Sequence, residues 1–310
     1  MITAKDVRAA RETIGGDLHH TPTFSSATLG RRVFLKAEFF QRTGSFKPRG
    51  VLNKLRSLTH EERARGVIAA SAGNHAQALA WCAAREGVDA LLVMWSSASA
   101  AKIAATRGYG AQVDLEAAGP ETVFERLAEL EDKTGRTPVH AFDDPLVAAG
   151  QGTVGLEIVE DVSGVDVVVV PVGGGGLIAG IAAALPQIRI VGVEPSGSTA
   201  LTSGAAAGEP TPVVPSSIAD GLNAPFAGRL GIDVALARGL ELVLVEDTEI
   251  EDAMRFLYER AKLACEPAGA AAVAALRAGK VAAENAETVV AVVSGGNVAT
   301  EVAAAILARL

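Results

Sequence analysis

Residues 167–186 place the strongest limit on the fold, because this segment contains no charged side chain. Its length would suit a transmembrane helix. However, Pro171 and four consecutive glycines at 173–176 interrupt it, and both residue types break helices. We therefore expect a buried strand, a glycine turn and a buried helix, and no membrane span.

Apolar runs and helical patterns alternate along nearly the whole chain. Several runs are short, continuous and rich in Val, Ile and Leu, as in strands buried on both faces of a parallel sheet. The expected strands are 32–38, 67–71, 89–95, 111–115, 138–141, 166–172, 189–194, 241–246 and 288–293. The expected helices are one that starts with a capping box at Thr3 and Asp6, and the segments 76–87, 120–134, 247–264 and 298–309. This alternation predicts α/β layers with right-handed crossovers, and leaves 195–231 as the least regular segment.

Composition excludes several classes of function. A chain of 310 residues is long for one compact core and suggests two lobes. The net charge of -8 argues against nucleic acid, because neutralising phosphates requires a basic surface, and no polybasic run suggests an anionic membrane. Cys82 and Cys265 are too few for a disulfide framework and lack metal-ligand spacing. The N-terminus has no apolar signal segment, so we expect a cytoplasmic protein.

One lysine has an unusual setting. Lys47 stands between Phe46 and Pro48, in an expected turn flanked by Gly44 and Gly50, just after an apolar run. A lysine amine becomes a nucleophile when burial or a neighbouring cation lowers its pKa and frees the neutral form for Schiff-base formation. The alternative is an ordinary solvated charge, and this segment alone leaves both interpretations open.

Three further segments follow expected strands, at the edge where open α/β sheets bind ligands. Residues 71–77 precede a helix whose N-terminus suits a carboxylate or phosphate, although Asn74 could also be a simple cap. The glycines at 173–176 make either a tight turn or an anion-binding loop, without the spacing of a P-loop or dinucleotide fingerprint. Ser294, in the segment 294–297, is either a cap or a neutral hydrogen-bond partner.

These four segments together resemble, in the same order, the motifs of fold-type II pyridoxal phosphate enzymes. The closest likeness is to the threonine/serine dehydratase and serine racemase group, and it covers essentially the whole chain. Segments 218–221 and 266–270 give two milder matches. The resemblance implies two open, twisted, mostly parallel α/β lobes, with pyridoxal 5'-phosphate in the cleft between them. The implied lobes are 1–43 plus 141–310, and 44–140, with no C-terminal regulatory domain.

The resemblance also implies a role for each matching residue. Lys47 would form the Schiff base and remove the Cα proton, and Phe46 would pack against the cofactor ring. The other implied cofactor contacts are Asn74 at the ring hydroxyl, Ser294 at the ring nitrogen, and Gly173, Gly174, Gly175, Gly176 and Leu177 at the phosphate. The implied contacts of the substrate carboxylate are Ser71, Gly73, Asn74 and His75. Glu266 would join Lys47 and Ser71 as a catalytic residue, on the leaving-group side.

Several positions separate this chain from other members of that superfamily. Ser294 cannot stabilise a pyridinium as an aspartate would, which suits elimination over transamination. Ala72 stands where related racemases carry a serine acid/base, and His75 where cysteine synthases typically show threonine. Glu194 could ligate a divalent cation, but Ala200 replaces an expected acidic ligand, so we expect no firm metal site.

The sequence thus predicts a pyridoxal phosphate-dependent lyase that dehydrates and deaminates a 3-hydroxy amino acid. L-Threonine, giving 2-oxobutanoate and ammonia, is the expected first substrate, L-serine is second, and bulkier 3-hydroxy amino acids stay open. The alternatives are a serine racemase-like enzyme, a β-replacement enzyme and a non-catalytic ligand-binding protein on the same fold. We expect a homodimer or larger homo-oligomer. Trp95 either reshapes the entrance or packs, and packing is the favoured interpretation.

Overall fold

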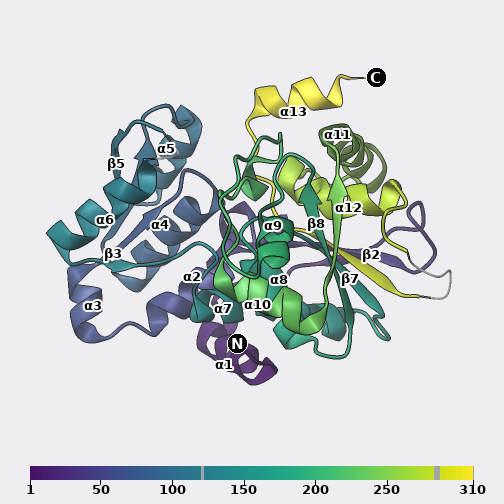
Figure 1. Cartoon of the computed structure of the whole chain (residues 1–310), viewed down its shortest axis with the longest axis horizontal. Coiled ribbons are helices and arrows are strands. Elements are labelled where there is room, and N and C mark those ends of the chain that lie inside the picture. The colour runs from purple at the N-terminus through teal and green to yellow at the C-terminus, as the bar shows by residue number, and fades with distance from the viewer. Residues whose placement is uncertain (120–121, 283–286, 310) are drawn as a thin grey trace.

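The computed structural model of the chain describes residues 1–119, 122–282 and 287–309, and contains two twisted sheets flanked by helices (Figure 1). The larger sheet has the strand order β1-β2-β10-β7-β8-β9, and the smaller has the order β5-β4-β3-β6. Every neighbouring pair of strands is parallel except β1 with β2. The fold class expected from the sequence, a mostly parallel α/β architecture, is therefore confirmed.

The strands are short and the helices cover both faces of each sheet. The strands are β1 (Thr23–Ser25), β2 (Val33–Ala37), β3 (Val67–Ala70), β4 (Ala90–Trp95), β5 (Gln112–Ala117), β6 (Thr137–Pro138), β7 (Val167–Pro171), β8 (Arg189–Pro195), β9 (Glu241–Val245) and β10 (Val289–Val293). The first seven helices are α1 (Ala4–Ile14), α2 (Lys47–Arg56), α3 (His60–Arg65), α4 (Asn74–Glu86), α5 (Ala100–Gly108), α6 (Val123–Thr134) and α7 (Pro145–Asp161). The remaining helices are α8 (Gly176–Ala184), α9 (Ala200–Ala207), α10 (Arg229–Arg238), α11 (Asp247–Phe256), α12 (Pro267–Arg277) and α13 (Thr300–Leu307).

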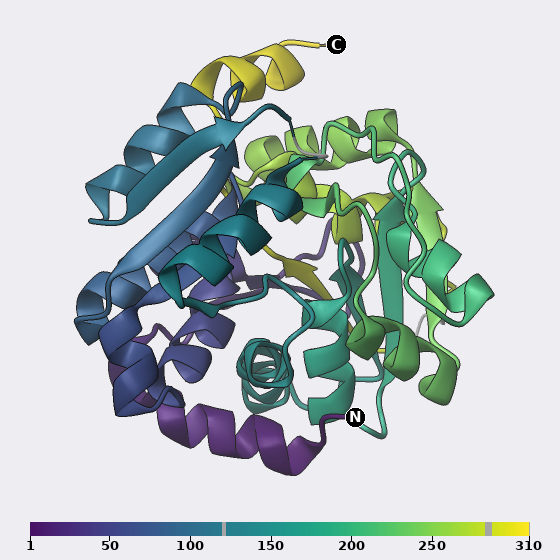
Figure 2. The ribbon, with the colours of Figure 1, turned by 60° about the vertical axis from the view of Figure 1, so that its left-hand side comes forward.

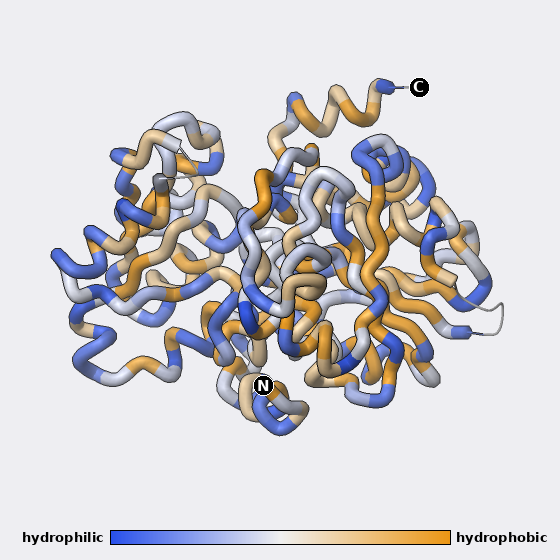
Figure 3. Tube along the Cα trace, viewed as in Figure 1, coloured by the Kyte–Doolittle hydropathy of each residue, from blue (hydrophilic) through white to orange (hydrophobic). Residues whose placement is uncertain are grey.

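The valine-rich strands of the larger sheet bury both faces. Side chains alternate between two cores along β7, so that Val167 and Val169 contact one cluster and Val168 and Val170 the other. One cluster includes α11 and α12, and the other includes α7 and α8. Figure 3 shows hydrophobic residues gathered along these strands, with hydrophilic residues on the outer turns.

Helix α7 lies between α2 and α8 and contacts both along their length. The helix backbones approach each other so closely that only glycine fits at two of the contact positions. A Cβ on Gly150 would lie 2.3 Å from the carbonyl oxygen of Arg49 in α2, and a Cβ on Gly180 would lie 2.2 Å from that of Ala148 in α7. The backbones of α2, α7 and α8 therefore pack in direct contact.

Most expected elements are confirmed, and the differences have local causes. Residues 167–186 form β7, a glycine loop and α8, and no described helix is long and apolar enough to cross a membrane. The capping box at Thr3 and Asp6 starts α1 as expected. The expected helix 247–264 was too long, because α11 gives way to a π-helix at Leu257–Ala261 and ends at Lys262, which has a φ of 61°.

Two further differences concern segment 195–231 and the strand β1. Segment 195–231 contains α9 and the start of α10, so it is more regular than expected. The strand β1 was not expected from the sequence, because most of its residues are exposed. Helix α6 is described from Val123, and residues 120 and 121 of the expected helix lie outside the described residues. The division into lobes at 44 and 141 stays a prediction, although the smaller sheet lies wholly between these positions (Figure 2).

A buried ionic network fixes α2 to the larger sheet. The guanidinium of Arg49 pairs with Glu38 at 2.8 Å and with Glu157 of α7 at 2.6 Å. Lys36 of β2, which is 0 % exposed, pairs with Glu157 at 2.9 Å and donates to the carbonyl oxygen of Thr21 at 2.6 Å. Burial opposes ionisation of Glu157, but Arg49 and Lys36 hold its pKa below the usual value.

We expect the change Arg49→Met to lower the free energy of unfolding by about 3–5 kcal/mol, because it leaves buried carboxylates without their main partner. Urea unfolding of the full chain measures this difference. The control is Arg11→Met, which breaks the exposed Arg11–Glu160 pair and should cost less than about 1 kcal/mol. Equal losses in the two variants would contradict a special role for the buried network.

Candidate active site

Lys47 is the first residue of α2, rather than part of an open turn as the sequence suggested. Thr43 and Gly44 precede it with φ values of 59° and 74°, which redirect the chain into the helix. Ser45 forms a bridge with Gly295, and the N–H of Phe46 donates to the carbonyl oxygen of Ser294 at 3.2 Å. The lysine segment and the segment 294–297 are therefore joined by backbone hydrogen bonds.

The Lys47 amine is held in a setting that favours its neutral form. Its Nζ donates to the carbonyl oxygen of Ala141 at 2.9 Å and lies 5.1 Å from the centre of the Phe46 ring. Burial lowers the pKa of Lys47 to about 8, and the charge of Glu266 acts in the opposite direction. A substantial share of neutral amine is therefore present near pH 8, as a nucleophilic or basic lysine requires.

Asn74, Glu266 and Asn297 form a polar chain beside this lysine. The Asn74 Nδ2 donates to the Glu266 carboxylate at 2.7 Å, and the Asn297 Nδ2 donates to Asn74 Oδ1 at 2.8 Å. Burial, and then the charge of Asp220, raise the pKa of Glu266 to about 8. Glu266 therefore holds a proton at neutral pH that it can exchange within this site.

The N-terminus of α4 is open to an anion. Gly73 occupies the N-cap position without any side-chain cap, and a Cβ placed on Gly73 would meet no atom within 4 Å. The hydroxyl of Ser71 accepts a hydrogen bond from the Gly73 N–H at 3.2 Å. Unpaired N–H groups and the helix dipole make such an end suitable for a carboxylate.

The side chain of His75 is hydrogen-bonded to the backbone rather than left free for a ligand. Its ring is buried and shares a 2.8 Å hydrogen bond with the carbonyl oxygen of Val139, and burial lowers its pKa to about 3. The ring is therefore neutral and engaged with the backbone of Val139. At this helix end, His75 can contribute its backbone N–H to an anion site.

A second anion-binding loop precedes α8. Gly175 has a φ of 92° and is the N-cap of α8, which has no capping side chain. A Cβ on Gly174 would fall 2.3 Å from the Phe142 ring, so only glycine fits there. The loop Gly173 to Leu177 thus offers backbone N–H groups at an uncapped helix end, as phosphate sites do.

Comparisons with known proteins agree with this geometry. A family model described as "Pyridoxal-phosphate dependent enzyme" matches residues 15–295. The chain belongs to the family of pyridoxal phosphate-dependent enzymes. It is 43% identical to the L-threonine ammonia-lyase of Thermotoga maritima, over 96% of this chain and 76% of that protein.

Solved structures give the same fold. Maize serine racemase superposes with a TM-score of 0.91 at 35% identity, covering 97% of this chain and 95% of that one. A threonine deaminase from T.th. superposes with a TM-score of 0.87 at 35% identity, covering 96% of this chain and 99% of that one. The fold-type II architecture and the cofactor class expected from the sequence are thereby confirmed.

The residues present fit pyridoxal phosphate. The site offers a lysine amine with a lowered pKa, an aromatic ring beside it and a glycine loop at an uncapped helix end. The buried hydroxyl of Ser45, next to Lys47, has no hydrogen-bond partner among the described residues. Ser294, at the end of β10, is 4 % exposed and carries no charge. These groups match the aldehyde, ring and phosphate of the cofactor.

Glu194, which the sequence offered as a possible cation ligand, has another partner. Its carboxylate accepts hydrogen bonds from the backbone N–H groups of Leu201 at 2.7 Å and Thr202 at 2.9 Å, and from the Thr202 hydroxyl. Glu194 therefore caps α9, whose first residue is Ala200. Within residues 1–119, 122–282 and 287–309, no group of three or more His, Cys, Asp or Glu side chains could hold a metal ion.

Sequence reasoning missed several participants. The role of Asn297 and the carbonyl group of Ala141 as the lysine's acceptor were not expected. Asp220 was noted only as part of a matching segment, although its charge acts on Glu266. The one signal available in the sequence was the placement of polar residues after strand ends. It included Asn297 in a candidate segment but did not reveal its hydrogen bond to Asn74.

Trp95 packs against two hydrophobic clusters of the smaller sheet, and Ala72 is buried in one of them.

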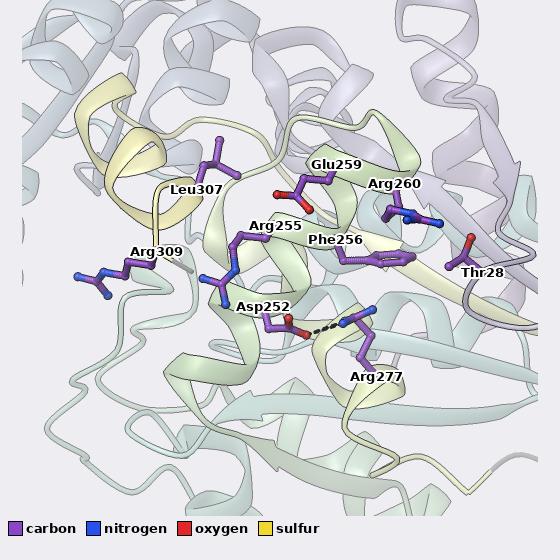
Figure 4. A pocket seen from close by; sticks show the side chains of 9 residues that line it. All are labelled: Thr28, Asp252, Arg255, Phe256, Glu259, Arg260, Arg277, Leu307 and Arg309. Carbon is purple, nitrogen blue, oxygen red and sulfur yellow. Dashed lines mark hydrogen bonds and ion pairs between the residues drawn. The ribbon is translucent and has the colours of Figure 1, made fainter.

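A pocket of about 580 Å³ lies outside the candidate site (Figure 4). It lies among α11, α12 and the chain beyond α13, and its lining mixes arginines with acidic side chains. Asp252 and Arg277 form an ion pair at 2.7 Å across one side of it. The residues that line it are Thr28, Asp252, Arg255, Phe256, Glu259, Arg260, Arg277, Leu307 and Arg309. None of the expected site residues contributes to it.

We expect the capture of pyridoxal phosphate by the cofactor-free chain to increase with pH through a midpoint near 8, because only the neutral Lys47 amine reacts. In the variant Glu266→Gln the midpoint should fall, because the charge that raises the lysine pKa is gone. Rapid-mixing absorbance measures the capture. As a control, Glu194→Gln removes a buried carboxylate elsewhere and should leave the midpoint in place. A midpoint near 10.5, the ordinary value for lysine, would contradict the assignment.

Proposed function

We propose that this chain is a lyase that eliminates the hydroxyl group of a 3-hydroxy amino acid and releases a 2-oxo acid and ammonia. L-Threonine, which gives 2-oxobutanoate, is the first substrate, and L-serine is the second. The observation that carries the proposal is the Lys47 amine, with its lowered pKa, placed beside a neutral Ser294 and two uncapped helix ends. The cofactor supplies the electron sink for the reaction.

The chain's own residues then have distinct tasks. The backbone N–H groups at Gly73, Asn74 and His75, with the Ser71 hydroxyl, hold the substrate carboxylate. Lys47 takes the Cα proton, and Glu266 serves the leaving-group side. The cofactor contacts in this proposal are Phe46, Asn74, Gly173, Gly174, Gly175, Gly176, Leu177 and Ser294. The neutral serine at the ring nitrogen limits charge build-up on the ring and favours elimination.

The choice of threonine rests on the relatives named above. L-Threonine ammonia-lyase and threonine deaminase are named for this substrate, while the structural likeness to a serine racemase supports the alternative. Racemisation requires an acid/base on the face of the substrate opposite Lys47. The buried methyl group of Ala72 provides none, so dehydration is favoured.

We further propose that the enzyme works in the cytoplasm as a homodimer or larger homo-oligomer. The net charge of -8 suits an acidic cytoplasmic enzyme, and the exposed aromatic pair Phe24 and Phe40, with ring centres 6.3 Å apart, offers a surface for contact between copies.

We expect the purified, reconstituted chain to release 2-oxobutanoate from L-threonine, and the variant Lys47→Ala to lose at least about 1000-fold in rate, because the base is absent. Formation of the 2-oxo acid measures the reaction. A matched control is Lys54→Ala, which changes another lysine of the same helix, paired with Asp144, and should retain most of the rate. Equal activity in the Lys47→Ala variant would exclude the proposed mechanism.

We expect L-serine recovered from incomplete reactions to contain no D-isomer, since Ala72 offers no acid/base group at the position where a racemase needs one. Chiral chromatography of the recovered amino acid tests this. The variant Ala72→Ser should introduce measurable D-serine if its hydroxyl reaches the substrate. Substantial D-serine from the unchanged chain would instead favour the racemase alternative.

A further inference from the structure

One buried amide lies between the two helices that begin at the candidate site. Gln151 stands near the middle of α7 and is 0 % exposed. Its Cγ lies 3.0 Å from the position of a Cβ on Gly50, in the first turn of α2, and its Oε1 lies 2.8 Å from that of a Cβ on Gly176, the first residue of α8. The side chain therefore reaches from the helix that carries Lys47 to the helix that follows the glycine loop.

Neither polar atom of this amide has a partner in the protein. The Nε2 and Oε1 atoms of Gln151 make no hydrogen bond within the described part of the chain. Buried amides are nearly always hydrogen-bonded, because an unpaired one loses its contacts with water and gains nothing in return. An apolar side chain of the same length would fill this position without that cost. The unpaired amide at the start of α8 therefore points to a ligand that supplies its partner.

The surroundings of the glycine loop add little other polarity. The atoms nearest to the Cβ positions of its four glycines belong to Leu222, Phe142, Gly231, Leu201 and Gln151. Gln151 is the one residue of this set with a polar side chain, and the set contains no lysine or arginine. An anion at the loop would therefore be held by uncharged donors, with the Gln151 amide beside the backbone N–H groups.

We propose that Gln151 is a side-chain contact of the cofactor phosphate and donates from Nε2 to a phosphate oxygen. A half-turn of the amide about its last bond exchanges Nε2 and Oε1, so a donor can stand beside Gly176 while the helices stay in place. Hydrogen bonds to an ionised oxygen are stronger than those between neutral groups. Gln151 thus adds a directed donor to a loop that otherwise offers backbone alone.

This inference goes beyond the proposed elimination, because it concerns the cofactor and requires no substrate. It needs the cofactor class that the family shares, and the fit of the residues to that cofactor. It also makes a selective claim: the Gln151 amide responds to the phosphate, and the aldehyde and the ring do not depend on it.

The test compares two ligands of the cofactor-free chain, pyridoxal 5'-phosphate and pyridoxal, which present the same aldehyde to Lys47 and differ by the phosphate. The variant Gln151→Met keeps the length of the side chain and removes the amide. We expect it to weaken the binding of pyridoxal 5'-phosphate by about tenfold or more, because a hydrogen bond to a charged group is lost. The affinity for pyridoxal should not fall. Equilibrium titration followed by absorbance measures both.

Unfolding in urea separates a ligand contact from a structural role. In the cofactor-free chain, Gln151→Met should leave the urea midpoint unchanged or raise it, because an unpaired buried amide is removed. The rise in midpoint on adding pyridoxal 5'-phosphate should be smaller than in the unchanged chain, since the ligand binds less tightly. Phosphorus NMR of the bound cofactor should show a changed phosphate resonance in the variant.

A second variant and a matched control complete the design. Gln151→Leu removes the amide with a differently shaped side chain, so the comparison of ligands does not depend on how well one variant folds. The control is Thr288→Val, which removes another buried hydrogen-bonding atom without a partner among the described residues. Thr288 directly precedes β10, at the edge of the larger sheet opposite Ser294, so both affinities should be unchanged.

Three outcomes would overturn the inference. Equal losses for pyridoxal 5'-phosphate and pyridoxal would mean that Gln151 acts on the lysine, and unchanged affinity for both would mean that the amide contacts neither ligand. A urea midpoint that falls equally with and without cofactor would assign the amide to the fold. Because no substrate enters these measurements, failure of the proposed elimination leaves the inference standing, and failure of the inference leaves the elimination standing.

Discussion

The burial of two cations beside the larger sheet is the constraint on which the rest of the site depends. Arg49 and Lys36 are removed from water, and moving such ions into the interior carries a cost that only close carboxylate partners offset. Glu38 and Glu157 supply these partners from a 3-10 turn and from α7. Since Arg49 lies two residues after Lys47, this network fixes the first turn of α2 and hence the origin of the reactive side chain.

Much of the architecture could be predicted from local pattern. The strands at 167–171 and 289–293 are buried on both faces, so nearly all of their residues are apolar. Such continuous apolar runs are visible in the sequence, and they predicted both strands. Lys47, Asn74, the glycine loop and Ser294 all follow strand ends or begin helices, so a sequence that shows such junctions also shows where ligands bind. The assignment of the family followed from the order of these motifs.

The remaining features depend on contacts between distant segments. Helix α9 begins where it does because the carboxylate of Glu194, in β8, accepts its first N–H groups, which no local pattern reveals. The chain of Asn74, Glu266 and Asn297 joins residues separated by about two hundred positions. The ion pair between Lys102 of α5 and Asp220 is likewise visible only once the two sheets are placed side by side.

The close contact of three helices has a consequence for the spacing of the site. Lys47 begins α2 and the glycine loop begins α8, and both helices rest directly on the backbone of α7. Close packing against α7 therefore positions both of the helices whose first turns carry the amine and the anion-binding loop. A methyl group added at Gly150 or Gly180 would push the neighbouring helix backbones apart. It would therefore change the relative positions of the lysine and the glycine loop.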